Sequence, residues 1–168
     1  MDVLWQGAAL CAVFTLLILP SQFKNPLSQI ASYPSAIRKR VEGLPQYRGM
    51  YRSERKRNIV RKTVGSLIAV VLFACLSIVS GKTTFVSSFV HVFILFQVVN
   101  LYDLLIFDFV IFPHSKRLRI PGTEDMTDEY KDPVHHIKGA GKGVLIGTVI
   151  AVLSACVVEI IMRIGFVG

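Results

Sequence analysis

The sequence has 168 residues, of which 52% are hydrophobic and 18% are charged, and its formal net charge is +8. This composition excludes an ordinary soluble domain, which carries more charge and shorter apolar runs. The positive charge does not indicate nucleic-acid binding, because the basic residues flank long apolar segments, where the charge bias of membrane-protein loops explains them.

Four apolar segments, each close to the roughly 20 residues that cross a bilayer, follow one another along the chain. They cover residues 3–20, 64–80, 85–112 and 143–167. We therefore predict an all-α integral membrane four-helix bundle that forms one domain over residues 1–168. Asp2 is the only charge before the first segment, whereas a signal peptide begins with basic residues, so we expect this segment to be retained as a helix.

The basic residues are distributed unevenly between the connections. Eleven lie in the loop 21–63 and six in the loop 113–142, whereas the turn between the second and third segments holds only Lys82. Basic residues concentrate in cytoplasmic loops. We therefore predict that both long loops are cytoplasmic and both termini lie outside the cell membrane (N-out/C-out), so that anionic headgroups of the cytoplasmic leaflet are the natural partner.

A short amphipathic helix is predicted within the first loop. Ile37, Val41 and Leu44 recur at helical spacing, beside the basic residues Arg38, Lys39 and Arg40. The Tyr33-Pro34 and Leu44-Pro45 pairs set its limits. Such a helix suits the surface of an anionic membrane. The alternative is that these charges only set the topology.

The third apolar segment carries the polar residues that are most expensive to place in a bilayer. Gln97, Asn100 and Asp108 fall on one side of a helix, and Asp103 adjoins them. This side is expected to face the bundle or a cleft that opens to the cytoplasm. Asp103 lies deeper than Asp108, so it is the better functional candidate.

The fourth apolar segment predicts close helix packing. A small residue occurs at every fourth position, namely Gly143, Gly147, Ala151 and Ala155. The same stripe continues to Glu159, which predicts an outer polar cluster of His91, Glu159 and Gln6. The alternative is a pair within the helix between Glu159 and Arg163.

The loop 113–142 begins basic and then turns acidic, and it ends in two histidines. Carboxylates and imidazoles are ligands for divalent metals. The candidate metal ligands are Asp103, Asp108, Glu124, Asp125, Glu129, Asp132, His135 and His136. No HExxH, CxxC or DxDxDG pattern is present, so the spacing does not identify a metal. The alternative is that the acidic loop neutralises the basic first loop. Candidate contacts for a phosphate or headgroup are Arg117, Arg119, Arg38 and Arg40.

One stretch of the loop resembles a known group of proteins. The run Ile120-Pro-Gly-Thr-Glu-Asp-Met126, with Glu129-Tyr130-Lys131-Asp132 and a following histidine, is similar to uncharacterised small multi-pass bacterial membrane proteins. The resemblance covers about a fifth of the chain. It implies a bacterial membrane context and no activity.

Three functional hypotheses remain, and they leave open whether the protein is an enzyme. The first is a site for a metal or a lipid headgroup at the cytoplasmic side of the bundle, built from the polar residues of the third segment and the acidic loop. The second is a non-catalytic accessory subunit that packs against a larger membrane partner. The third is an ion or proton pathway in a homo-oligomer.

Overall fold

The computed structural model describes residues 3–165, and every regular element in this range is a helix. Four helices are long and apolar enough to cross a membrane, which makes the chain a multi-pass membrane protein. They are α1 (Val3–Lys24), α3 (Met50–Val79), α4 (Phe85–Tyr102) with its continuation through η3 (Asp103–Ile111) and α5 (Phe112–His114), and α7 (Pro133–Gly165).

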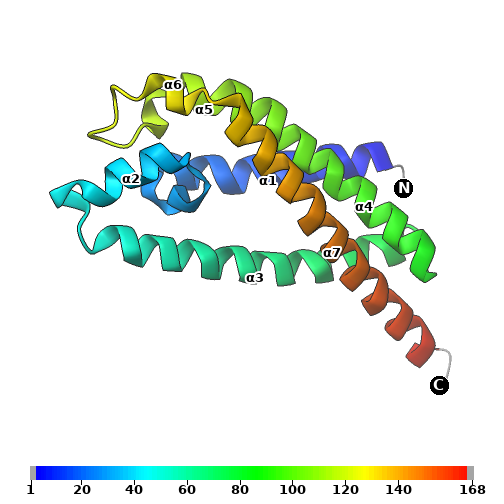
Figure 1. Ribbon diagram of the computed structural model, residues 1–168. Helices are drawn as coiled ribbons and strands as arrows, with labels where there is room; N and C mark the ends of the chain where they lie inside the picture. Colours follow the sequence, from blue (N-terminus) through cyan, green and yellow to red (C-terminus); the bar gives the residue numbers. More distant parts are fainter. Residues whose placement is uncertain (1–2, 166–168) are drawn as a thin grey trace.

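Short helices gather at one end of the molecule (Figure 1). They are η1 (Pro26–Ser32), α2 (Ser35–Gly43), η2 (Pro45–Tyr47), η4 (Lys116–Leu118) and α6 (Thr127–Tyr130). We call this the loop end. The turn between α3 and α4 and both ends of the chain lie at the opposite, terminal end (Figure 1). This arrangement is what four crossings require.

The helices extend beyond the predicted apolar segments. α1 continues through Pro20 to Lys24. α3 begins at Met50, whereas the predicted segment began at residue 64, and α7 begins at Pro133, whereas the predicted segment began at residue 143. Residues 166 and 167 of the predicted fourth segment lie outside the described residues. Hydropathy marks the part of a helix that suits lipid, whereas the helix begins where the backbone allows it. Gly49 has a φ of 85° just before α3, and a proline at the first position suits the start of α7.

The α4–α7 pair is the most extensive helix contact in the bundle. A Cβ atom added at Gly143 would overlap the Asn100 side chain, and one at Gly147 would lie 2.7 Å from Nε2 of Gln97 and overlap Phe96. The two glycines therefore allow α4 to approach closely. Further along the same face of α7, Ala151 and Ala155 are fully buried. The small-residue stripe thus lies in this contact.

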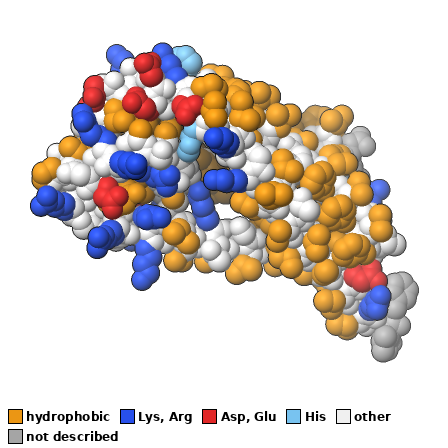
Figure 2. Space-filling model, viewed as in Figure 1, with side chains coloured by type: hydrophobic (Ala, Val, Ile, Leu, Met, Phe, Trp, Pro, Cys, Tyr) orange, Lys and Arg blue, Asp and Glu red, His pale blue; other side chains and the backbone are white. Residues whose placement is uncertain are grey.

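The outer faces of the long helices are apolar. Large side chains on all four remain exposed, including Leu16 on α1, Leu67 on α3, Leu101 on α4 and Leu145 on α7. Figure 2 shows hydrophobic side chains over most of the visible face and charged ones gathered at the loop end. An apolar surface of this extent suits hydrocarbon.

The loop end has a hydrophobic core of its own, which joins the loop 21–63 to the loop 113–142. Ile37 and Val41 of α2 are fully buried in the same cluster as Tyr33, Ile120 and Tyr130. The predicted short helix is therefore present, but its apolar face is enclosed by protein. Only its basic face is available to a membrane surface.

Candidate functional site

A cavity of about 410 Å³ lies between α1, η1, α3, α4, η3 and α7 near the loop end. Its apolar lining includes Phe14 and Phe96, and its polar lining comes from η1 and from three of the long helices. The polar residues are Ser32 of η1, Lys62 of α3, Asn100, Asp103 and Asp108 of α4 and η3, and His135, His136 and Lys142 of α7. Oppositely charged groups thus face one space inside an otherwise apolar bundle.

The backbone of η3 explains how both aspartates reach this cavity. Asp103–Ile111 is a π-helix, whose hydrogen bonds join residues five apart, as between the N–H of Phe112 and the carbonyl of Phe107. Residues five apart therefore lie on nearly the same face, whereas an α-helix would turn Asp108 well away from Asp103. π-helical geometry is rare, and the single-turn π-bulges in which it mostly occurs are frequent at functional sites.

Asp108 has a partner inside the protein. His136 is buried, and its Nδ1 lies 3.2 Å from Oδ1 of Asp108. Its Nε2 lies 3.4 Å from the carbonyl oxygen of Tyr130. Both ring nitrogens face acceptors, so a ring that is protonated at both nitrogens satisfies both contacts and neutralises Asp108.

Ser32 connects η1 to both walls of the cavity. Its hydroxyl accepts a hydrogen bond of 2.9 Å from Nζ of Lys62, and its carbonyl accepts one of 2.9 Å from Nε2 of His135. A lysine ammonium has three donors, so Lys62 retains donors for another group. Asn58 reinforces this wall from α3, because its buried amide donates to the carbonyl of Ser28 at 2.7 Å.

Asp103 and Lys142 differ from Asp108 in having no ion-pair partner among residues 3–165. Asp103 is partly buried and Lys142 is exposed. Since His136 engages Asp108, the lysines and carboxyl that line the cavity without an ion-pair partner are Lys62, Lys142 and Asp103. The arrangement therefore offers two amino groups and one carboxyl group to a bound molecule.

Gln97 and Asn100, two of the polar residues predicted on the third segment, lie at the side of the cavity. Nδ2 of Asn100 donates to Oε1 of Gln97 at 3.3 Å and to the carbonyl of Ala140 at 3.1 Å, which joins α4 to α7. Asn100 lines the cavity, whereas the Gln97 amide faces Gly147. Both amides thus serve the helix contact.

The eight candidate metal ligands divide into two groups. Asp103, Asp108, His135 and His136 line the cavity. The four acidic residues of the loop do not reach it. Among residues 3–165, no group of three or more histidine, cysteine, aspartate or glutamate side chains is arranged to hold a metal ion.

Three of these acidic side chains have local structural contacts instead. Glu124 accepts hydrogen bonds of 2.8 and 3.0 Å from the N–H of Gly122, and Asp132 accepts one of 3.0 Å from Val134 at the start of α7. Asp125 lies 3.1 Å from Arg40 of α2, and this ion pair is exposed. The acidic loop is thus engaged with its own backbone and with the first loop.

The run Ile120–Met126 forms a compact turn that docks on the first loop. Gly122 has a φ of 89°, and the hydroxyl of Thr123 donates to the carbonyl of Ile120 at 2.7 Å. The phenolic oxygen of Tyr130 accepts from the N–H of Ile120 at 3.0 Å. The residues that carry the sequence resemblance therefore shape a loop and lie outside the cavity.

The folded loop end shifts the pKa values of two side chains, Glu124 and Tyr33. Hydrogen bonds from the backbone N–H groups of Glu124 itself and of Gly122 lower the pKa of the Glu124 carboxyl. Burial, with a smaller contribution from Tyr130, raises the pKa of the Tyr33 phenol, whose hydroxyl donates to the carbonyl of Leu118 at 2.8 Å.

The predicted headgroup arginines lie away from the cavity. The guanidinium of Arg117 lies 5.9 Å from the ring centre of Phe23, and that of Arg119 lies 6.0 Å from the ring centre of Tyr130. Arg40 pairs with the acidic loop, and Arg38 is partly buried at α2. The lysines that line the cavity are Lys62 and Lys142, which in the sequence are part of the charge bias that predicts the topology. Each lies within two residues of the start of an apolar segment, and that position is their only signal in the sequence.

A second polar cluster lies at the terminal end. The buried Gln6 of α1 accepts from Nε2 of His91 at 2.8 Å and donates to the hydroxyl of Ser80 at 2.7 Å. Nδ1 of His91 lies 3.0 Å from the hydroxyl of Ser77. The structure thus brings Gln6 and His91 together. These bonds satisfy both ring nitrogens, as apolar surroundings require.

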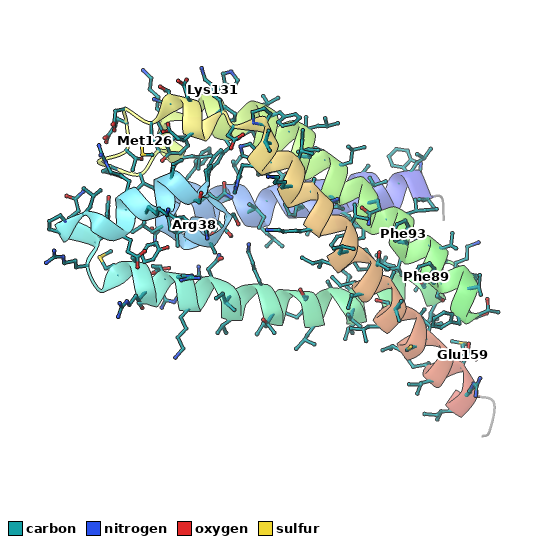
Figure 3. The ribbon with its side chains drawn as sticks, viewed as in Figure 1. Arg38, Phe89, Phe93, Met126, Lys131 and Glu159 are labelled. Carbon is teal, nitrogen blue, oxygen red and sulfur yellow. The ribbon has the colours of Figure 1, made fainter. Side chains whose placement is uncertain are left out.

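Glu159 lies apart from this cluster, towards the far end of α7 from the loop end (Figure 3). It pairs with Arg163 on the same helix, at 3.0 Å. The structure therefore has the intrahelical pair and does not place Glu159 against His91.

Comparison of the chain with protein-family models, with curated proteins and with solved structures finds no match in any of the three. Fold and site together define a four-span membrane protein with a polar cavity near its loop end. The functional argument therefore rests on the geometry of this cavity.

Proposed function

We propose that this protein binds the phosphate-bearing headgroup of a membrane lipid in the cavity at its loop end. The observation that carries the proposal is the set of charges that faces the cavity, namely Lys62, Lys142 and Asp103. Lysine ammonium groups bind phosphate as point charges. The carboxylate of Asp103 is suited to an amine or hydroxyl on the same headgroup.

The loop end faces the cytoplasm of a bacterial cell in this proposal, with both termini outside the cytoplasmic membrane. The seventeen basic residues of the two long loops support this orientation, against Lys82 alone in the turn. The basic face of α2 then lies towards anionic headgroups, which raises the local concentration of anionic lipid near the cavity.

A headgroup suits the cavity better than a divalent metal does. Within residues 3–165 the chain gathers no set of three suitable ligands, and the two lysines of the cavity repel a cation and so oppose the attraction of its carboxylates. An ion or proton pathway has less support, because the fully buried side chains of Val92, Leu95 and Ala151 separate the cluster at His91 from the cavity. The accessory-subunit hypothesis has less support, because the small-residue stripe that was expected to contact a partner packs against α4 of the same chain.

Lipid retention by purified protein tests the proposal. The protein is stripped of lipid in detergent, exposed to phosphatidic acid, phosphatidylglycerol or phosphatidylethanolamine, and the lipid retained is quantified by mass spectrometry. Combining Lys62→Gln with Lys142→Gln is expected to lower retention of all three about tenfold, because charge-assisted hydrogen bonds to phosphate are lost. Asp103→Asn is expected to lower selectively the retention of phosphatidylethanolamine.

A matched control removes the same charge outside the cavity. Arg61 directly precedes Lys62, and Lys138 lies one helical turn before Lys142; neither lines the cavity. Arg61→Gln with Lys138→Gln therefore retains lipid like the unchanged protein. Equal losses in both double variants would show that only overall charge matters, and the proposed function would be wrong.

A further inference from the structure

An apolar groove of about 290 Å³ runs between α3 and α7 on the lipid-facing side of the bundle. Leu67 and Val70 line it from α3, and Leu145, Val149 and Leu153 line it from α7. Ser66 is its one polar side chain. The groove is therefore suited to hydrocarbon and not to a polar ligand.

The groove lies next to the polar cavity. Ile146 lines both spaces. On α3, Lys62 lines the cavity and Ser66, one helical turn further into the bundle, lines the groove. On α7, Lys142 and Ile146 are related in the same way. Each helix thus presents a cation at the loop end and apolar side chains beyond it, on one continuous face.

The groove is bounded towards the terminal end. Beyond Leu153, the hydroxyl of Ser154 donates to the carbonyl of Val70 at 3.1 Å and joins α7 to α3. The nearly buried Ile150 lines the groove from the core side. From Leu145 to Leu153 the groove extends about 12 Å along α7. It is a slot of limited length that begins beside the cavity.

We propose that one hydrocarbon chain of the lipid lies in this α3–α7 groove while its phosphate occupies the cavity. The proposal rests on the proposed function and adds the ligand class, an amphiphile with a phosphate head and an extended chain. The phosphate lies between Lys62 and Lys142, and the chain passes Ile146 to lie along Val149. Hydrocarbon gains little from leaving one apolar environment for another, so the groove selects chain shape and position while the cavity supplies affinity.

The test is photo-crosslinking with phosphatidic acid that carries a diazirine on one acyl chain. The full-length protein is placed in phosphatidylcholine nanodiscs that contain a small fraction of the probe, and adducts are mapped by peptide mass spectrometry. Adducts are expected at the residues that line the groove, namely Ser66, Leu67 and Val70 of α3 and Leu145, Val149 and Leu153 of α7. Few are expected at Ile68, Val71 and Leu72 of α3, which do not line it. Water-soluble glycerol phosphate competes for the cavity and lowers the groove adducts.

Two tryptophan variants on α7 separate the tail site from the head site. Val149→Trp fills the groove and is expected to abolish the groove adducts; Val152→Trp, on the same helix outside the groove, leaves them unchanged. Adducts spread evenly over the lipid-facing surface, or equal in the two variants, would overturn the groove assignment. In that event retention in detergent would still depend on Lys62 and Lys142. Loss of that dependence would overturn the headgroup site itself.

Discussion

At the scale of single residues, the two aspartates of η3 differ in their surroundings and not in their chemistry. Asp108 lies against the buried His136, whereas Asp103 has no ion-pair partner within residues 3–165. A partly buried carboxylate without a partner costs free energy in an apolar bundle. Such a group persists where a bound ligand or a functional requirement compensates for the cost, and this is why Asp103 stands at the centre of the proposed site.

Gly147 gives a residue-scale prediction about packing. A Cβ atom there would overlap the ring of Phe96, so Gly147→Ala must displace α4 or force that side chain off its rotamer. We expect the free energy of unfolding to fall by about 1–3 kcal/mol. The measurement is reversible unfolding in detergent micelles.

Gly139 and Gly141 provide the control on the same helix. A Cβ atom at either position meets nothing within 4 Å. Gly139→Ala and Gly141→Ala should therefore leave stability unchanged or raise it slightly, because alanine favours the helix. If Gly147→Ala behaved like these two, the close approach of α4 and α7 would not occur.

At the scale of elements, hydropathy and the positions of prolines predict most of the helices. The four long helices and α2 follow from apolar runs, from the spacing of Ile37 and Val41, and from the prolines that flank them. The π-helix was not predictable, because the residues from Asp103 to Ile111 contain no glycine or proline that would mark it. An α-helical projection therefore placed Asp103 only beside the polar face, whereas the π-helix aligns it with Asp108.

The site was less predictable than the helices for a related reason. Asp103, Asp108, His135 and His136 were recognised as polar residues near one end of the bundle, and they do line one cavity. Lys62 and Lys142 have the positions of ordinary flanking charges in the sequence, since only the tertiary arrangement brings them to one cavity. The sequence also predicts that the acidic loop belongs to the site, because carboxylates are metal ligands. The backbone hydrogen bonds that engage these carboxylates instead, such as those from Gly122 to Glu124, cannot be seen in the sequence.

The Ile120–Met126 turn gives an element-scale prediction about pH. Because backbone hydrogen bonds lower the pKa of Glu124 in the folded loop, its carboxylate stabilises the turn at pH values above its ordinary pKa of 4.5. This contribution is lost as the pH falls through the lowered folded-state pKa. We therefore expect hydrogen exchange at the Gly122 amide, corrected for the intrinsic rate, to accelerate below about pH 4.5.

The variant Glu124→Gln isolates this carboxylate. It keeps the size of the side chain but removes the titrating group, so exchange at Gly122 should be faster at neutral pH and no longer depend on acidification. Asp128→Asn, in the exposed part of α6, is the control and keeps the pH dependence. A pH dependence that survived in Glu124→Gln would assign the effect to another group.

At the scale of the whole molecule, one feature organises the structure: polarity is separated along the bundle axis. The loop end carries a compact core, the docked loops and the cavity, whereas the terminal end holds the hydrogen-bonded cluster around His91 and the ion pair on α7. The proposed lipid site lies where these two environments meet, with Lys62 and Lys142 at the polar side and the α3–α7 groove at the apolar side. An amphiphile has the same division of polarity, so it matches the bundle without any rearrangement of the helices.

The orientation of this axis in the membrane gives the last prediction. In a background with Cys11, Cys75 and Cys156 replaced by serine, a single cysteine is introduced at Lys82 in the terminal-end turn or at Asp128 in α6. In the proposed orientation the basic loop end is cytoplasmic, so a membrane-impermeant maleimide should label Lys82→Cys in intact bacterial cells and Asp128→Cys only after permeabilisation. Labelling of both in permeabilised cells establishes that each thiol is reactive. The reverse pattern in intact cells would place the cavity at the external face, and its lipid would then have to come from the outer leaflet.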